Sequence, residues 1–321
     1  MVSVRALGLL AGYLADRRWG DPRDHHPVAA FGRVASGLER RMWVDDRRAG
    51  VAYAAALVGG TALAGTLLER LSRRSAALRF LVTATSTWAV LGGRSLIAES
   101  NAVRTLLAAD DLDAARARLT HLVGRDTASL TEPQVARAVI ESVAENTSDA
   151  VVAPLLAGAV AGVPGLPAYR AANTLDAMVG HRSARHENFG WASARLDDVL
   201  NWLPARIGAA LAVAFAPTIG GDSADALRVW KRDADAHPSP NAGQIEAAFA
   251  GALDVRLGGV NSYAGEVEDR HALGDGREPT RSDIEAANHL SAMVGAGALV
   301  LAMAFSRRRR RQPTPRRRSG R

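Results

Sequence analysis

The chain alternates long uncharged apolar stretches with short charged segments, a pattern typical of helical membrane proteins. Residues 49–68 form an uncharged run bracketed by "DDRR" and "ERLSRR", long enough to cross a hydrocarbon core of about 30 Å. A second long run covers 290–306, and shorter runs cover 80–93, 150–169 and 207–221. Runs of about 10–14 residues also occur in buried helices of soluble proteins. Five apolar runs in one chain nevertheless favour a membrane protein.

Helices are the predicted secondary structure, since alternating runs of β-branched and aromatic residues are absent. The predicted fold class is therefore all-α: a polytopic helical membrane protein with short, proline-broken apolar helices and polar motifs in the loops. The run at 150–169 contains Pro154, Pro164 and Pro167, so we expect it to be buried in protein and not to cross the membrane. We predict a single membrane-embedded domain over residues 1–306.

The segment "TEPQVARAVIESVAENTSDAVVAPL" predicts a helix with an acidic face. Thr131 is the expected N-cap, because Gln134 follows three residues later and Pro133 suits the first turn. Further along, three carboxylates four residues apart would stack on one face, where like charges repel by a few tenths of a kcal/mol per pair. These are Glu141, Glu145 and Asp149. An exposed acidic stripe is the simple alternative, but ionisable groups at membrane depth are costly and are usually functional.

A bound cation would convert this repulsion into binding energy. Hard cations such as Mg²⁺ take oxygen ligands, typically one or two carboxylates together with substrate phosphates. We therefore interpret the three carboxylates as a site for Mg²⁺–nucleotide or for a cationic substrate.

The formal net charge of +7 arises at the C-terminus. Residues 307–321, "RRRRRQPTPRRRSGR", carry nine arginines and no acidic residue, so the rest of the chain has a net charge of −2. A run of like charges with two prolines predicts a disordered Arg-rich tail. Because no aromatic residues interleave for base stacking, and because the tail follows an apolar run, we predict no nucleic-acid binding and a cytoplasmic flank.

Common enzyme motifs are absent from the sequence. The sole lysine, Lys231, has no glycine-rich loop before it, which excludes a Walker-type phosphate loop. HExxH and GxSxG do not occur, and the absence of cysteine excludes disulfides and thiolate chemistry. Polar residues instead gather at 20–32, 169–206 and 237–253. Taken singly, each of these segments is more readily explained as a turn, a helix cap or a solvated helix face.

Six ordered motifs together resemble the adenosylcobinamide-phosphate synthase family of cobalamin biosynthesis, the CbiB/CobD family. They are "GDPRDHHPV", "LVGRDTASL", "ESVAENTSDAVVAPL", "NTLDAMVGH", "FGWASARLDDVLNWLPAR" and "SPNAGQIEAAFAGALDVRLGG". The resemblance runs from about Gly12 to about Gly274 and leaves the arginine tail outside. One departure is that His181 and His186 stand where tyrosines are expected after "NTLDAMVG", which puts aromatic stacking there in doubt.

The resemblance implies an integral membrane enzyme that joins adenosylcobyric acid to aminopropanol or its O-phosphate through an amide bond, using ATP and Mg²⁺. Such carbon–nitrogen ligases usually activate the carboxylate as an acyl phosphate, which the amine then attacks. This chemistry needs positive charge near the phosphates and a base for the incoming ammonium.

On this basis we assign roles to residues within the motifs. Expected catalytic residues are Glu145, Asp176 and Asp197. The expected metal ligands are Glu141, Glu145 and Asp149. Expected substrate or nucleotide contacts are His26, Asn146, Asn173, Arg182, Arg195 and Asn241.

The implied partners are corrinoid and amino-alcohol substrates and membrane lipid, and a homo-oligomer is left open. The implied location is the cell membrane, with several spans and an active site that faces the cytoplasm. A membrane transporter or scaffold that couples buried carboxylates to ions is the main alternative. A soluble helical binding protein with a basic tail is another.

Overall fold

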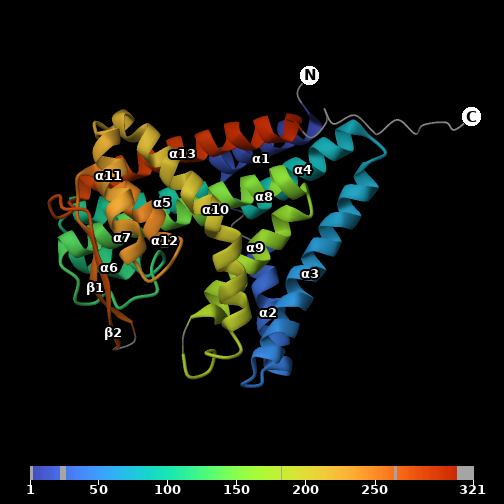
Figure 1. Cartoon of the computed structure of the whole chain (residues 1–321), viewed down its shortest axis with the longest axis horizontal. Coiled ribbons are helices and arrows are strands. Elements are labelled where there is room, and N and C mark those ends of the chain that lie inside the picture. Colours follow the sequence, from blue (N-terminus) through green and yellow to red (C-terminus); the bar gives the residue numbers. More distant parts are fainter. Residues whose placement is uncertain (1–2, 22–26, 182, 264–265, 309–321) are drawn as a thin grey trace, which may run out of the picture.

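The computed structural model describes residues 3–21, 27–181, 183–263 and 266–308. This part of the chain is mostly helical, as Figure 1 shows, and the all-α prediction is confirmed. The α-helices are α1 (Val4–Trp19), α2 (Pro27–Met42), α3 (Arg47–Ser72), α4 (Ala76–Val90), α5 (Gly93–Ala108), α6 (Leu112–Leu119), α7 (Glu132–Thr147), α8 (Ala153–Ala161), α9 (Gly165–Leu175), α10 (Trp191–Phe215), α11 (Ser223–Asp233), α12 (Ala242–Leu253) and α13 (Arg281–Arg308). Short π-helical turns are η1 (Ser148–Val152) and η2 (Asp176–Gly180), and short 3₁₀ turns are η3 (Ala216–Ile219) and η4 (Ala234–Ala236).

Three helical segments within the described residues are long and apolar enough to cross a membrane. They are α3, the continuous segment Trp191–Ile219, and α13 as far as Ser306. Helix α3 lies along one outer edge of the molecule in Figure 1, and only 22% of its apolar window is buried within the protein. Its exposed leucines, among them Leu63, Leu67 and Leu71, form a surface suited to hydrocarbon.

The remaining two apolar runs do not form long helices. Residues 80–93 fall mainly in α4, and residues 150–169 are divided among η1, α8 and α9. Gly162 ends α8 with a φ of 77°, and Pro164 precedes α9. Most side chains of η1 and α8 are buried, as expected for a proline-broken run enclosed by other helices.

Helices α7 and α12 form the interior of the part of the molecule that carries the hairpin (Figure 1). Helix α7 begins as predicted, with Pro133 in its first turn and Gln134 Oε1 accepting a hydrogen bond from the Thr131 N–H at 2.8 Å. Every residue of α12 is buried, including Gln244 and Glu246. These two helices therefore carry polar side chains into a protein interior.

A β-hairpin interrupts the otherwise helical structure, and the sequence pattern does not predict it. Strands β1 (Leu257–Tyr263) and β2 (Glu266–Leu273) pair antiparallel with a bulge between Gly258 and Val260. Gly258 has a φ of 73°, and a Cβ there would lie 1.9 Å from the His271 carbonyl oxygen. The strand signal is missing from the sequence because glycines interrupt β1 and charged residues fill much of β2.

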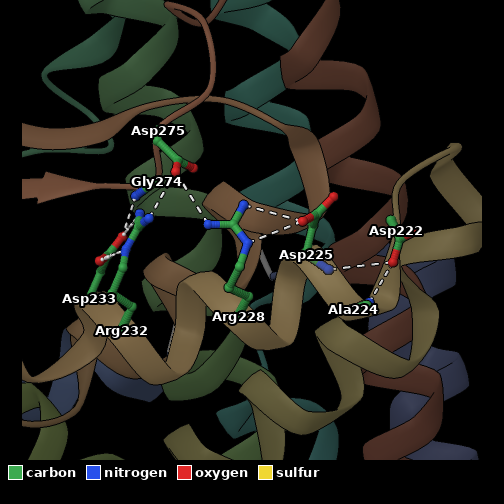
Figure 2. A network of polar contacts seen from close by, with 8 residues as sticks. All are labelled: Asp222, Ala224, Asp225, Arg228, Arg232, Asp233, Gly274 and Asp275. Atoms are coloured by element: carbon green, nitrogen blue, oxygen red, sulfur yellow. Dashed lines mark hydrogen bonds and ion pairs between the residues drawn. The ribbon is translucent and has the colours of Figure 1, made fainter.

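Polar contacts fix the end of this hairpin to α11, as Figure 2 shows. Arg228 and Arg232 both reach Asp275 Oδ2, at 3.2 Å and 2.8 Å. The Gly274 N–H donates to Asp233 Oδ2 at 2.8 Å. This network fixes the end of the hairpin, whose base is also held by Leu257 and Leu273 in the hydrophobic core.

Helix α13 extends two residues beyond the predicted domain boundary, to Arg308. Residues 309–321, most of the predicted disordered tail, lie outside the described residues.

A small second core joins α2 and α3 to the segment before α10. Tyr53 packs against Phe189 with ring centroids 5.0 Å apart, and its hydroxyl donates to the Ala35 carbonyl at 3.2 Å. Gly50 permits this close approach, since a Cβ at this position would lie 2.0 Å from the Phe189 carbonyl oxygen.

Gly50→Ala should therefore lower the free energy of unfolding by at least about 1–3 kcal/mol, because the added methyl group forces α3 away from the backbone at Phe189. Thermal unfolding in detergent measures the effect. Gly59→Ala is the matched control on the same helix, since no atom lies within 4 Å of its added Cβ. The control should be neutral or stabilising by up to about 1 kcal/mol. Equal melting temperatures for both variants would contradict the packing described here.

Candidate functional site

The predicted row of three carboxylates is divided in the structure. Glu141 Oε2 forms a buried ion pair with Arg125, and its Oε1 accepts a hydrogen bond from the Gly258 N–H at 2.8 Å. The two side chains of the ion pair, Arg125 and Glu141, are 4% and 7% exposed. Both oxygens of Glu141 thus already have protein donors, and its role as a metal ligand stays a prediction.

Two π-helical turns place the neighbouring carboxylates. Asp149 lies in η1, which follows α7 without a break, and Asp176 is the first residue of η2, which follows α9. A π turn adds a residue to one helical turn and changes the direction of the side chains that follow, and such turns are frequent at functional sites. Asp149 therefore does not continue a straight row with Glu141 and Glu145.

Acidic side chains from four elements line one small cavity of about 80 Å³, here called the acid cavity. Its wall includes Ser148, Asn201, Ser239, Asn241, Ala242 and Ile245 in addition to the carboxylates. The carboxylates come from α7, η1, η2 and α10, and they are Glu145, Asp149, Asp176, Asp197 and Asp198. The predicted catalytic residues are thus brought together, although Asp176 and Asp197 are far from Glu145 in the sequence.

Amide side chains hold the carboxylates in place. Asn173 Nδ2 bridges Asp149 Oδ2 at 3.2 Å and Asp197 Oδ1 at 3.3 Å. Asn201 Nδ2 donates to Asp197 Oδ2 at 2.9 Å, and the Tyr169 hydroxyl donates to Asn201 Oδ1 at 2.7 Å. Hydrogen bonds from neutral donors lower the repulsion between two close carboxylates without removing their charge.

Two further polar atoms at the cavity are buried and lack a hydrogen-bond partner among the described residues. They are Ser148 Oγ and Asn241 Oδ1. Ser148 is 2% exposed and Asn241 is 8% exposed. The Asn241 amide nitrogen donates to the Asp198 carbonyl at 2.9 Å, which leaves its oxygen for another group. Unsatisfied buried polar atoms cost about 1–3 kcal/mol each, and they are common where a ligand completes the site.

Burial and mutual repulsion raise the pKa values of the cavity carboxylates that lie outside the candidate membrane spans. Burial raises the pKa of Asp176 to about 7, with repulsion from Asp197, Asp198 and Glu145 as the next causes. The pKa values of Glu145 and Asp149 are also raised, mainly by burial. A carboxyl group with a pKa near neutrality is suited to transfer a proton at physiological pH.

The raised pKa of Asp176 predicts a pH-dependent effect of Asp176→Asn on stability. A carboxyl whose pKa is raised on folding contributes stability below its ordinary value of 3.8, and this contribution is lost as the pH rises to about 7. In metal-free detergent solution, the variant should melt like the wild type at about pH 4 and at a higher temperature above pH 7. Asp113→Asn, which alters an exposed carboxylate on α6, is the control and should change the melting temperature only slightly at either pH. A flat difference for Asp176→Asn would refute the assigned burial.

Two other predicted contact residues, Asn146 and Arg195, do not line the cavity themselves. Asn146 donates to the Ser142 carbonyl one turn earlier on its own helix at 2.9 Å, and Arg195 is exposed and pairs with Asp198 at 3.4 Å. His26 and Arg182 fall outside the described residues. Asn173 and Asn241, by contrast, contact the acid cavity or its carboxylates.

Sequence reasoning missed a second buried acid behind the cavity. Glu246 on α12 is buried, its Oε2 lies 3.9 Å from His237 Nε2, and burial raises its pKa together with repulsion from Glu141 and Glu145. The motif "SPNAGQIE" contains this residue, but the apolar character of α12 gave no indication of what the carboxylate would face. Asn201 was also missed, although it stands one helical turn after Asp197.

The donor set of the acid cavity suits a hard divalent cation, since its carboxylate, amide and hydroxyl groups all offer oxygen. Among the described residues, however, no three His, Asp or Glu side chains form a preformed metal-binding group. The three predicted ligands, Glu141, Glu145 and Asp149, do not form such a group among the described residues, and their assignment to a metal stays a prediction. Mg²⁺ commonly takes only one or two protein carboxylates and completes its shell with water and substrate phosphates, so the oxygen atoms present still fit it.

Comparison with known proteins identifies the family of the chain. The family model described as CobD/Cbib protein matches residues 9–291. The "Cobalamin biosynthesis protein CobD" of Mycobacterium tuberculosis (strain ATCC 25618 / H37Rv) is 52% identical over 300 residues, covering 94% of this chain and 95% of the relative. The protein of the same name from Geobacter metallireducens is 44% identical over 276 residues, covering 84% and 87%. No solved structure matches. The chain therefore belongs to the CobD/CbiB family of cobalamin biosynthesis proteins.

Proposed function

We propose that the protein catalyses ATP-dependent amide ligation of adenosylcobyric acid with aminopropanol or aminopropanol O-phosphate. The carboxylate of the corrinoid would attack the γ-phosphorus of ATP, giving an acyl phosphate and ADP. The amine would then attack the acyl carbon, so that the amide bond forms and inorganic phosphate leaves. The product is adenosylcobinamide or its phosphate, and the ammonium proton must pass to a base.

The observation that supports this proposal is the acid cavity, with its carboxylates and its two unpartnered polar atoms. Glu145 and Asp149, aided by Ser148 Oγ and Asn241 Oδ1, are the residues that would hold Mg²⁺. Bound there, the ion would neutralise phosphate charge on ATP. The N-terminus of α12 begins at the same cavity, at Ala242, and the positive end of a helix dipole favours phosphate.

The carboxylates would divide between binding and proton transfer. Asp176, with a pKa of about 7, is the best base for the incoming ammonium. Asp197 is held by Asn173 and Asn201 at both of its oxygens, which suits orientation of a substrate group. Arg195 pairs with Asp198 at the surface and would reach a phosphate only by leaving that carboxylate.

We further propose that the protein resides in the cell membrane with the acid cavity facing the cytoplasm. Three candidate spans support membrane residence, and ATP is available on the cytoplasmic side. Asp197, Asp198 and Asn201 occupy the first part of the candidate span Trp191–Ile219, which would place the cavity near one surface of the membrane.

The decisive experiment is an assay of membranes that contain the full-length protein, supplied with adenosylcobyric acid, ATP and Mg²⁺. We expect formation of adenosylcobinamide with aminopropanol, or of its phosphate with aminopropanol O-phosphate, and one equivalent of ADP per amide. Omission of either ATP or Mg²⁺ should abolish the product. Uptake of a corrinoid or amine into sealed vesicles without amide formation would instead indicate a transporter.

A further inference from the structure

A second cavity, of about 260 Å³, lies between α1, α5 and α13 and shares no lining residue with the acid cavity. One wall is apolar, with Ile97 from α5 and Val151 from η1. Small residues of α5 and α13 also line it, and its polar side chains include Asp16, Arg17, Arg94, Asn101 and Asn288. No part of the amide ligation described above requires this space.

A buried carboxylate lies in this cavity with one oxygen unpaired. Asp16 is 1% exposed, and its Oδ2 accepts a hydrogen bond from the Arg94 N–H at 3.3 Å. Its Oδ1 is buried without a hydrogen-bond partner among the described residues. Burial raises the pKa of Asp16 to about 6, which reflects the missing stabilisation of its charge. A hydrogen-bond donor on a ligand, above all a cationic group, would pair with this oxygen.

Two arginines stand at the more exposed part of the same cavity. Arg17 and Arg94 are both exposed, and Arg94 Nη1 donates to the Arg17 carbonyl oxygen at 3.3 Å, which holds its guanidinium near the rim. The remaining donors of both side chains suit a phosphate or carboxylate group. The cavity thus presents a negative group at depth and positive groups toward solvent.

Hydrogen bonds join the two helices of the opposite wall. Ser100 Oγ donates to Asn288 Oδ1 at 2.9 Å, and Asn288 Nδ2 donates to Asn101 Oδ1 at 3.3 Å, so α5 and α13 are joined across the cavity. A cavity held open by such a network is suited to a preformed ligand site.

We propose that this cavity binds a small zwitterionic amine, with its protonated amine on Asp16 and its anionic group between Arg17 and Arg94. A ligand with only a few bonds between its two charged groups fits the cavity of about 260 Å³. An aminoalkyl phosphate and a short amino acid share this chemistry. The choice of aminopropanol O-phosphate as the first probe rests on the proposed function. The arrangement of Asp16, Arg17 and Arg94 does not depend on that function.

The cavity also adjoins the acid cavity through a single turn. Ser148 and Asp149 of η1 line the acid cavity, and Val151 of the same turn lines the second cavity. The Gly92 N–H, just before α5, donates to the Ala150 carbonyl of this turn at 3.2 Å. A ligand on Asp16 would therefore contact the segment that positions Asp149.

Isothermal titration of the purified full-length protein in detergent, without ATP or corrinoid, tests the proposal separately from turnover. We expect aminopropanol O-phosphate to bind at least about tenfold more tightly than aminopropanol, propan-2-yl phosphate or inorganic phosphate, because each of these lacks one charged group. β-Alanine distinguishes the two sources of the anionic group: tighter binding of β-alanine assigns a carboxylate zwitterion, and weaker binding assigns a phosphate. If no zwitterion binds more tightly than its fragments, the proposal is wrong.

Two variants locate the binding. Asp16→Asn keeps an acceptor for the Arg94 N–H but removes the charge, and it should weaken zwitterion binding by about 10-fold or more. Ala98→Leu fills the cavity from the α5 wall and should abolish binding without removing any polar group. Asp113→Asn is the charge-matched control and should bind like the wild type. Unchanged affinity in both Asp16→Asn and Ala98→Leu would overturn the assignment, whatever the result of the ligase assay.

Discussion

Glu145→Gln should lower turnover by at least about 100-fold while the protein melts at the wild-type temperature or above. The side chain lies in the acid cavity, where its charge is opposed by burial and by neighbouring carboxylates. Glutamine retains the size and one oxygen acceptor but cannot hold a cation with a full negative charge. The apparent Mg²⁺ requirement should therefore rise together with the loss of turnover.

Turnover at saturating substrate, the Mg²⁺ dependence and the melting temperature in detergent together test this result. Glu132→Gln is the matched control, since it makes the same change at the start of the same helix and outside the cavity. Wild-type kinetics in Glu145→Gln would remove this carboxylate from the site. A normal Mg²⁺ dependence with reduced turnover would assign Glu145 to proton transfer or positioning.

Glu141→Gln should give the opposite pattern, a large loss of stability without a shift in the Mg²⁺ requirement. Its carboxylate forms a buried ion pair with Arg125 and also approaches Arg137 Nε at 3.6 Å. Removing one partner of a buried pair typically costs about 3–5 kcal/mol, because the remaining charge is left without full compensation. The hairpin should loosen as well, since Gly258 donates to the same carboxylate.

The double variant Arg125→Gln/Glu141→Gln separates charge from shape. It removes both charges of the pair, while the glutamine introduced at position 141 keeps an acceptor for the Gly258 N–H, so part of the lost stability should return. Asp113→Asn, which breaks the exposed pair with Arg116, should cost at most about 1 kcal/mol. A rise in the Mg²⁺ requirement of Glu141→Gln, at unchanged stability, would restore Glu141 to the metal site.

Local features of the sequence were sufficient to predict several properties. The apolar runs at 49–68 and 290–306 each lie within a single helix, and they identified α3 and α13 as candidate spans. Such spans can be found from the sequence because their hydropathy depends only on residues close together in the chain. The start of α7 was predicted from Thr131, Pro133 and Gln134, since a capping box involves only neighbouring residues. The motifs also indicated the family, which the comparisons confirm.

Which carboxylates meet was decided by the tertiary structure. Equal spacing in the sequence groups Glu141 with Glu145 and Asp149. In the structure, however, the Glu141 carboxylate contacts Arg125 and the Gly258 N–H. Neither contact can be predicted from the spacing of the three acids. The π turn at Asp149 cannot be read from the spacing either, because it depends on how the following segment packs.

The sequence by itself thus determined the helical, membrane-type character of the chain, the proline breaks and the family, all of which depend on residues close together in the chain. Only the tertiary structure determined the acid cavity, where Glu145, Asp176, Asp197 and Asn241 arrive from separate elements, and the hairpin, which depends on contacts with α7 and α11. The physical reason is the same in both cases. Burial and charge pairing are set by distant neighbours, and these neighbours are fixed only when the helices have packed.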